Sequence, residues 1–236
     1  MAILAFPPIE DADENGLLAF GGDLEISSLL LAYAHGIFPW PINDRYPLAW
    51  FSPDPRGIVE FSNLHLPRSL KKSIRSKDWI ITFNRCFDRV IHECSKLEHR
   101  KGDQSAHGTW ITEEIMQAYK DFHKAGHAYS VEVWLGEELV GGLYGTRIGQ
   151  AFSGESMFHC VTDASKIALA SLMFFLNQHG ISWLDTQMVT SVVENLGGIE
   201  IDRSEFIEML TINKNLNGDD IFAQRTSYKV LELIEL

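Results

Sequence analysis

The stretch AYSVEVWLGEELVGGLYGTRIGQAFSGESMF, residues 128–158, decides the predicted fold. Its apolar and β-branched runs are separated by two short turns, one around Gly136 and one near Gly149, which is typical of three successive antiparallel strands. A helix is predicted next, over residues 164–180, with Asp163 as its N-cap. Because this helix is apolar on nearly all sides, we expect it to be largely buried.

Further strands and helices are predicted on both sides of this stretch. WIITF (79–83) and WLDTQ (183–187) have the composition of strands, and Asn84 is the expected N-cap of the helix that follows the first. Thr112 is predicted to cap another helix, which ends at Gly126 because glycine readily takes the left-handed conformation after a last turn.

The last predicted helix begins at Asp202, where Asp202 and Glu205 have the spacing of a capping box. The order strand, helix, helix, three-strand meander, buried helix, strand, helix indicates an α+β fold with a mixed sheet. We predict a small N-terminal domain over residues 1–62 and a catalytic domain over residues 63–236.

The N-terminal region is rich in turns. Residues 37–57, IFPWPINDRYPLAWFSPDPRG, follow a short predicted helix that ends at Gly36 and contain five prolines and five aromatic residues. Prolines lack a backbone donor and fix φ, so this segment is expected to be rigid and irregular. Trp40 lies between two prolines and is placed to present a rigid ring face. The alternative is that it belongs to the core with Trp50 and Phe51.

Composition limits the class of protein. The chain has 236 residues and a formal net charge of −12, which argues against a general nucleic-acid coat. No apolar run approaches the roughly 20 residues that span a bilayer, and the start lacks the basic and apolar regions of an export signal. Three cysteines without metal-type spacing suit a reducing compartment. We therefore expect a cytoplasmic protein that does not associate with membranes.

Positive charge gathers in SNLHLPRSLKKSIRSKD, residues 62–78. On a helix, Arg68, Lys71, Lys72 and Arg75 share one face, because they stand at i, i+3, i+4 and i+7. This face can bind the phosphates of a polyanion, with an affinity that depends on salt. The alternative is an ordinary solvated helix surface.

Three polar residues stand in otherwise strand-like or apolar surroundings. Asp185 and Gln187 are two apart in a predicted strand and therefore project to the same side. Glu155 is expected at the end of the third meander strand, just before the turn into the buried helix. If these strand ends meet, two carboxylates and an amide converge beside apolar side chains, which is the usual composition of a small-molecule site. The alternative is a pair of buried acids bonded to the backbone.

Other candidate sites are weaker. His123 and His127 are four residues apart, but Gly126 interrupts their helix and no third ligand follows, so we expect no metal site. The glycines of residues 141–149 lie in a hairpin and not at the start of a helix, unlike those of phosphate-binding loops. Ser153 is not in a nucleophile elbow, and no histidine is placed to activate it.

The chain also resembles a known family. The segments that carry the resemblance, in order and spacing, are NGLLAFGGDL, AYAHGIFPW, WFSPDPRG, GTWIT, HAYSVEVW, LVGGLYG, FSGESMF, ASKIAL and LDTQ. They resemble the bacterial leucyl/phenylalanyl-tRNA–protein transferases from about residue 15 to about residue 206. GIFPW, SPDPRG and GESMF are the most specific of these segments.

The resemblance implies a fold and an activity. The catalytic domain is expected to look like the acyl-CoA-dependent N-acyltransferases, with an aminoacyl-tRNA as donor in place of coenzyme A. Such enzymes move Leu or Phe, with Met as a third candidate, to a protein that begins with Arg or Lys, which marks that protein for N-end-rule degradation. We expect a monomer. We also expect no cofactor, because an aminoacyl ester is already activated.

The resemblance also implies residue roles. The expected catalytic residues are Asp185, Gln187 and Glu155. The expected substrate-binding residues are Trp40, Trp110, Tyr119, Leu143, Phe152, Ser153, Met157, Leu169, Leu172 and Leu184. The two tryptophans would stack on the terminal adenosine, since such stacking contributes roughly 1–3 kcal/mol per base. The apolar residues would form the amino-acid pocket, and the basic helix over residues 68–75 would contact tRNA phosphates.

These roles give a chemical hypothesis. Aligning an amine with the ester carbonyl can supply on the order of 7–11 kcal/mol. The Gln187 carbonyl would orient the attacking N–H, while Asp185 would polarise Gln187 or take the proton at the end. Glu155 would hold a cation, either the ammonium of the aminoacyl group or the basic head of the acceptor.

The sequence departs from the family in two places. A segment resembling N-x-H-x-x-S-L-G is expected after LDTQ, but TSVVENLG places Thr190, Val192 and Asn195 at its polar positions. A histidine is therefore missing near the site, and any role it has in the family is vacant here. The tail after about residue 213 matches poorly, and no function is assigned to it.

Three rival functions remain at this stage. A conventional acyl-CoA N-acyltransferase would be stabilised by coenzyme A, although the chain lacks a basic Gly-rich helix start for the pyrophosphate. A non-catalytic RNA-binding module would bind charged and uncharged tRNA equally and leaves Glu155, Asp185 and Gln187 unexplained. An accessory fragment of a peptidoglycan-type aminoacyl transferase would have a different acceptor.

Overall fold

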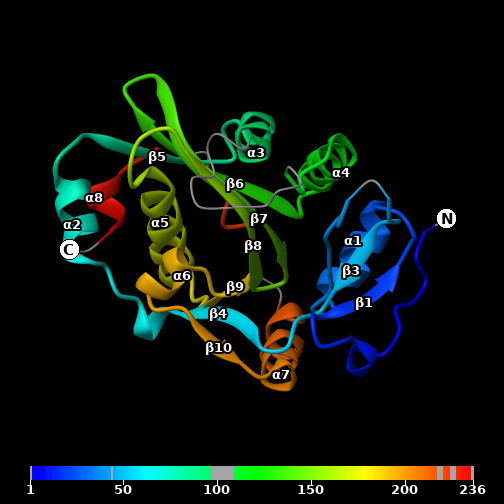
Figure 1. Cartoon of the computed structure of the whole chain (residues 1–236). Coiled ribbons are helices and arrows are strands. Elements are labelled where there is room, and N and C mark those ends of the chain that lie inside the picture. Colours follow the sequence, from blue (N-terminus) through cyan, green and yellow to red (C-terminus); the bar gives the residue numbers. More distant parts are fainter. Residues whose placement is uncertain (1, 44, 97–108, 217–219, 224–226, 235–236) are drawn as a thin grey trace.

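Two β-sheets organise the computed structural model, which describes residues 2–43, 45–96, 109–216, 220–223 and 227–234. The large sheet has eight strands in the order β10-β4-β9-β8-β7-β6-β5-β11, and the small sheet has the order β1-β3-β2 (Figure 1). Neighbouring strands are antiparallel except β8 and β9, which are parallel. The predicted α+β class with a mixed sheet is confirmed.

The elements have the following bounds. The large sheet contains β4 (Arg56–Glu60), β5 (Trp79–Phe83), β6 (Ala128–Leu135), β7 (Glu138–Ile148), β8 (Ala151–His159), β9 (Trp183–Gln187), β10 (Ile199–Ile201) and β11 (Tyr228–Lys229). The small sheet contains β1 (Leu17–Phe20), β2 (Phe38–Pro39) and β3 (Ala49–Phe51). The α-helices are α1 (Ile26–Tyr33), α2 (Arg68–Arg75), α3 (Phe87–Ser95), α4 (Glu113–Lys124), α5 (Ala164–Gln178), α6 (Ser191–Asn195), α7 (Arg203–Lys214) and α8 (Val230–Leu233).

The three-strand meander β6-β7-β8 is confirmed, with turns at Gly136 and Gly149. Both glycines have positive φ values, 61° and 60°, which glycine adopts at little cost. Gly149 also leaves no room for a side chain, because a Cβ there would lie 2.4 Å from the carbonyl oxygen of Lys214. Glu155 lies in the middle of β8 and not at its end, so the predicted position of this acid along the strand was wrong.

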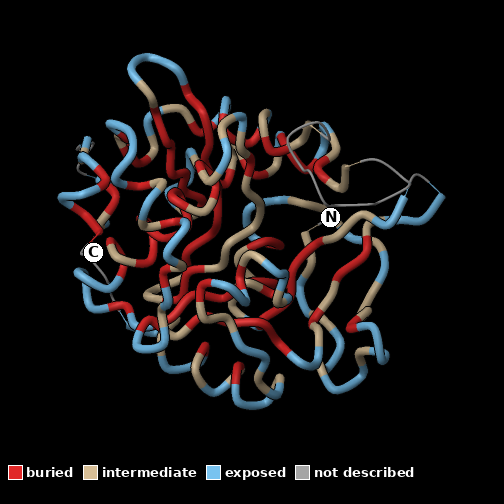
Figure 2. The backbone as a smooth tube through the Cα atoms, turned by 60° about the vertical axis from the view of Figure 1, so that its left-hand side comes forward, coloured by how far each residue is buried: buried red, intermediate tan, exposed pale blue. Residues whose placement is uncertain are grey.

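Helices cover both faces of the large sheet. The apolar helix α5 packs on one face, and α3 and α4 pack on the other (Figure 1). Eleven residues of α5 are buried, in agreement with the prediction that it is enclosed. Figure 2 shows that buried segments follow the strands, while exposed residues gather in the turns and outer loops. No helix among the described residues is long and apolar enough to cross a membrane.

The predicted helix caps met different outcomes. Thr112 caps α4, because its Oγ1 accepts the N–H of Ile115 at 3.2 Å. Asn84 is not the N-cap of α3; Cys86 takes that position. Asn84 adopts φ 54°, and its Oδ1 accepts the N–H of Ser130 at 2.9 Å, so it joins two segments of the sheet instead.

Two acids occupy N-cap positions without capping through their side chains. Asp163 has φ 70°, and its Oδ1 accepts a bond from Lys166 Nζ at 2.9 Å, but its side chain does not bond to the backbone N–H groups at the start of α5. Asp202 precedes α7 without a side-chain bond, so the predicted capping box with Glu205 is not formed. For Asp163, the ammonium group of Lys166 takes the place of a helix N–H partner.

The division into domains after residue 62 stays a prediction. The small sheet ends at Phe51, whereas β4 (Arg56–Glu60), which lies before the predicted boundary, pairs with β9 and β10 in the large sheet. The chain therefore enters the large sheet through the SPDPRG segment.

Candidate active site

Both carboxylate oxygens of Asp185, on β9, accept hydrogen bonds. It is 1% exposed and receives two bonds from Arg56 of β4: from Nε to Oδ1 at 2.8 Å and from Nη2 to Oδ2 at 2.7 Å. Ser153 Oγ donates to Oδ2 at 2.7 Å, and the backbone N–H of Gln187 donates to Oδ1 at 2.9 Å. Four donors therefore hold this carboxylate in one position.

Gln187 connects the two acids. It ends β9 with φ 64°, a conformation that is uncommon for residues other than glycine. Its Nε2 donates to Glu155 Oε1 at 3.0 Å, which leaves the amide oxygen as an acceptor for another group. The structure thus brings Glu155, Asp185 and Gln187 together, as the spacing predicted.

Glu155 also meets two tyrosines from outside the sheet. Tyr119 of α4 donates its O–H to Glu155 Oε2 at 3.3 Å, and the hydroxyls of Tyr119 and Tyr33 of α1 are hydrogen-bonded to each other. Burial raises the pKa of Glu155 to about 7, and the charge of Asp185 adds to this rise, against the lowering by bonds from Tyr33, Gln187 and Tyr119. The pKa values of both tyrosines lie well above 10, first because of burial and then because of Glu155.

A cavity of about 120 Å³ lies beside these groups. Its walls are Leu143, Tyr144, Gly154, Glu155, Ser156, Met157, Leu169, Leu172, Leu184, Thr186, Met188, Thr190 and Val193. Five of the six residues expected to form the amino-acid pocket are among them. The sixth, Phe152, is fully buried and packs in the core against Phe222 at a centroid distance of 5.9 Å.

The two tryptophans expected to hold a base lie together. Trp40 and Trp110 stack on each other, with ring centroids 5.2 Å apart and an interplanar angle of 20°. Both are partly exposed, and both pack at the edge of the core that contains Tyr33 and Tyr119. A planar base can therefore reach this aromatic pair only by adding to it or by separating its rings.

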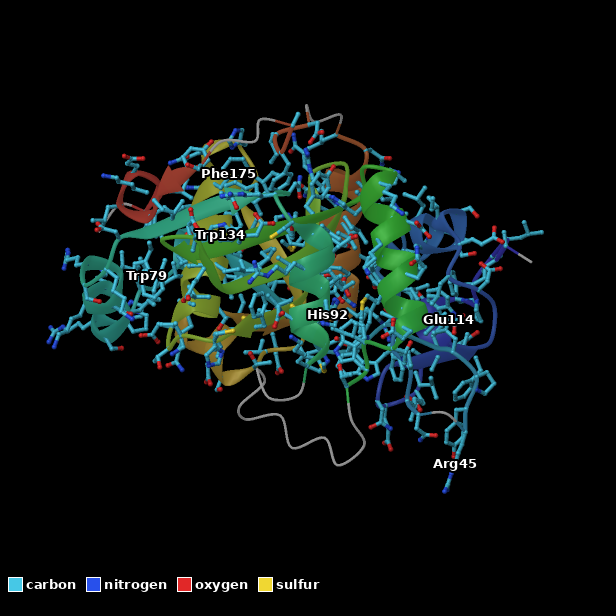
Figure 3. All side chains as sticks on the ribbon, turned by 90° about the horizontal axis from the view of Figure 1, so that it is seen from above. Arg45, Trp79, His92, Glu114, Trp134 and Phe175 are labelled. Carbon is cyan, nitrogen blue, oxygen red and sulfur yellow. The ribbon has the colours of Figure 1, made fainter. Side chains whose placement is uncertain are left out.

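The basic helix α2 forms as predicted. Leu70 and Ile74 bury its inner face, and Arg68, Lys71, Lys72 and Arg75 line one depression on its outer face. Trp79 of β5 fixes the end of the helix, since its Nε1 donates to the carbonyl of Ser73 at 3.0 Å (Figure 3). The residues expected to contact tRNA thus share one surface.

Comparison with known proteins decides the family. Residues 58–211 match the family described as leucyl/phenylalanyl-tRNA protein transferase, and residues 22–54 match the N-terminal domain of that family. The chain belongs to this family of transferases. A Shewanella baltica (strain OS223) protein named leucyl/phenylalanyl-tRNA–protein transferase is 46% identical over 231 residues, which covers 97% of this chain and 94% of that protein.

Other relatives agree. A Pseudoalteromonas atlantica protein of the same name is 46% identical over 209 residues, covering 88% of this chain and 87% of that protein. A Flavobacterium johnsoniae protein, also of that name, is 46% identical over 207 residues, which covers 88% of this chain and 95% of that protein. The predicted family and enzyme class, an aminoacyltransferase, are therefore confirmed.

One solved structure resembles the transferase distantly. "The structure of L-PGS from Bacillus licheniformis" has a TM-score of 0.38 and 12% identity, covering 70% of this chain and 52% of that chain. This similarity is too low to assign a fold, and the expected likeness to acyl-CoA-dependent N-acyltransferases stays a prediction.

Sequence reasoning missed several residues of this candidate site. Arg56 and Tyr33 were not expected there, and Thr186 and Met188 were not expected in the cavity wall. Strand alternation could have indicated Thr186, since it follows Leu184 by two residues on β9. Arg56 stands in the SPDPRG segment, whose prolines give no periodicity from which a partner could be read.

Proposed function

We propose that this transferase moves leucine or phenylalanine, and methionine as a third amino acid, from aminoacyl-tRNA to the N-terminal Arg or Lys of an acceptor protein. The observation that carries the proposal is the apolar cavity of about 120 Å³ in contact with Glu155. An apolar cavity of roughly this size, about 150 Å³, can hold a benzene ring. Met157 and Met188 add flexible walls that adapt to side chains of different shape.

The reaction is aminolysis of an ester. The neutral α-amine of the acceptor forms a C–N bond with the ester carbonyl, the bond from that carbon to the ribose oxygen breaks, and the amine proton goes to the departing ribose oxygen. An α-amine has a pKa near 8, so a useful fraction is neutral at about pH 7. Positioning of the two reactants is then the main requirement.

The contacts support separate roles for the three polar residues. The free amide oxygen of Gln187 accepts the attacking N–H, because its Nε2 is already bound to Glu155. Glu155 holds the ammonium of the aminoacyl group when its carboxyl is ionised. Asp185, whose oxygens already accept four bonds, acts by fixing Gln187 and not as the final proton acceptor.

The remaining surfaces would bind the tRNA. The Trp40–Trp110 pair stacks on the terminal adenosine, and the basic face of α2 contacts phosphates without reading sequence. Residues 1–62 and 63–236 act as two domains of a cytoplasmic monomer. The product carries Leu or Phe at its N-terminus and is thereby marked for N-end-rule degradation.

The test is transfer of radiolabelled leucine from Leu-tRNA to a model protein that begins with Arg, beside the same protein beginning with Gly. Label on the Arg protein alone is the expected result. Label on both proteins would contradict the proposed requirement for an N-terminal Arg or Lys on the acceptor. No label on either, together with a higher melting temperature in coenzyme A, would replace the donor with an acyl-CoA.

A further inference from the structure

Arg56 is a fully buried cation with one counter-charge. It is 1% exposed, and its Nε and Nη2 bind both oxygens of Asp185 at 2.8 and 2.7 Å. Its Nη1 donates to the carbonyl of Gly36 at 3.0 Å. The rings of Phe206 and Phe38 flank the guanidinium, with centroids 4.3 and 5.1 Å from Cζ. A planar fork held at this many points fixes the orientation of its partner carboxylate.

The orientation of Asp185 determines the conformation of Gln187. The same Oδ1 that accepts Arg56 Nε also accepts the backbone N–H of Gln187, whose φ of 64° needs such support. The neighbouring Gly57 allows the chain after Gln187 to pass closely, because a Cβ on Gly57 would lie 2.6 Å from the carbonyl carbon of Met188. Arg56 and Gly57 together therefore set the end of β9.

Arg56 also reaches the aromatic pair on the small sheet. Phe38 of β2, which flanks the guanidinium, lies edge-on to Trp40, with centroids 6.4 Å apart and planes at 64°. Trp40 in turn stacks on Trp110. A continuous series of contacts thus runs from the aromatic pair through Phe38 and Arg56 to Asp185.

We propose that Arg56 is a positioning residue for aminoacyl transfer, which holds Asp185 and Gln187 in register with the aromatic pair that receives the end of the tRNA. The proposal rests on the proposed function. Arg56 orients the carboxylate of Asp185 through two parallel hydrogen bonds, which a positive charge alone would not do. Lysine, a single point charge, cannot reproduce this pair of bonds.

The test compares Arg56→Lys with Arg203→Lys. Arg203 is the matched control, because its Nη1 donates to the carbonyl oxygen of Ser52 at 2.7 Å beside the small sheet, and the described contacts of Asp185 do not include it. We expect Arg56→Lys to lower kcat for leucine transfer at least about 30-fold, with KM for the acceptor within threefold of wild type. For Arg203→Lys, both kcat and KM should stay within threefold of the wild-type values. A folded Arg56→Lys variant with kcat within threefold of wild type overturns the proposal.

A second variant keeps the proposal testable if Arg56→Lys does not fold. If Arg56→Lys gives no soluble protein, Phe206→Leu loosens the guanidinium while preserving much of the apolar volume, and should lower kcat about fivefold. Wild-type kcat in that variant overturns the proposal.

A third readout does not depend on transfer. The ¹⁵N–¹H resonances of the Gln187 backbone and side-chain amides should shift in Arg56→Lys and stay in place in Arg203→Lys. Unmoved resonances in Arg56→Lys overturn the positioning role. A wild-type protein without transfer activity but with this pattern of shifts would instead overturn the proposed function alone.

Discussion

The surroundings of Glu155 place the titration of its carboxyl near neutral pH. Its oxygens accept bonds from Tyr119 and Gln187, and it lies on the wall of an apolar cavity. Burial raises its pKa to about 7, so it is half protonated close to neutral pH. To hold an ammonium group it must be ionised, which makes the proposed reaction sensitive to pH through this carboxyl.

The first prediction concerns the pH dependence of Glu155→Gln. Wild-type single-turnover transfer should rise as pH passes about 7, because the ionised form of Glu155 gains population there. The variant should transfer about a hundredfold more slowly, the scale of losing a positioned polar group, and keep only a rise near pH 8 from the amine. Rates measured from about pH 5.5 to 8.5 would show an unchanged inflection near 7 if another group is responsible.

Stability gives an independent check on the same carboxyl. The native pKa of about 7 exceeds the ordinary value of 4.5, so between these values the native state binds more protons than the unfolded state. The free energy of unfolding therefore falls as pH rises through this window, and Glu155→Gln removes that fall. Urea unfolding at several pH values measures the difference.

The second prediction separates Asp185 from Glu155. Both alanine variants should lose turnover by about a hundredfold. Asp185→Ala should also lose roughly 3–5 kcal/mol of unfolding free energy, because it leaves the buried guanidinium of Arg56 without its counter-charge. Glu155→Ala removes no counter-charge but takes the acceptor from Gln187 and Tyr119, and should therefore lose less, about 1–3 kcal/mol. Equal stability of the two variants, measured by urea denaturation, would contradict the assigned role of the ion pair.

At the scale of elements, α5 and β9 shape the amino-acid cavity. Leu169 and Leu172 come from α5, and Leu184 and Thr186 come from β9. A hydrophobic pocket separates side chains that differ by a methylene by only about 1–3 kcal/mol. In the proposed function, the volume left by these walls is expected to govern the preference between Leu and Phe.

The third prediction enlarges that cavity with Leu169→Ala. The ratio of kcat/KM for Phe-tRNA to that for Leu-tRNA should rise about tenfold, because the larger space favours the ring. Leu176→Ala is the control, since Leu176 is buried in the same helix and does not line the cavity. Both variants should lose stability by about 2–5 kcal/mol. A ratio that changes equally in both would place the side-chain pocket elsewhere.

The fourth prediction concerns helix α2. Replacing Lys71, Lys72 and Arg75 by Ala should raise KM for Leu-tRNA and reduce the slope of log affinity against log salt by about 2–3, one for each lost phosphate contact. The pair Lys120→Ala and Lys124→Ala on α4 is the control for lost charge. Filter binding across a salt series would show an unchanged slope if the face of α2 is merely solvated.

The elements themselves could largely be read from the sequence. Turn glycines and apolar, β-branched runs predicted the meander and the strand β9, and a nearly all-apolar run predicted the buried helix α5, because burial selects such side chains. Asp163 and Asp202 occupy the predicted N-cap positions, but neither side chain bonds to the helix backbone, and Cys86 takes the N-cap position predicted for Asn84. Arg56 was missed because its partner Asp185 is 129 residues away, and no local pattern reports such a contact.

At the scale of the whole molecule, the C-terminal tail completes the core of the large domain. Phe222, which lies beyond the residues 58–211 that match the family, is 2% exposed. The centroid of its ring lies 4.5 Å from the ring centroid of Tyr129, 5.3 Å from that of Phe175 and 5.7 Å from that of Phe83. It also contacts Phe152, the predicted pocket residue that the structure places in the core. The tail thus contributes to stability behind the amino-acid cavity.

The fifth prediction tests this contribution with Phe222→Ala. The variant should lose about 3–5 kcal/mol of unfolding free energy, because it removes a buried ring and leaves a cavity between four aromatic side chains. Ile221→Ala beside it is the control for the segment, since Ile221 is only partly buried, and should cost less. Turnover per folded molecule should stay within threefold in Phe222→Ala, because no described contact joins this ring to Gln187 or Glu155. Wild-type stability would instead mean that the tail can leave the core without loss, and a large fall in turnover at full stability would place it in the reaction itself.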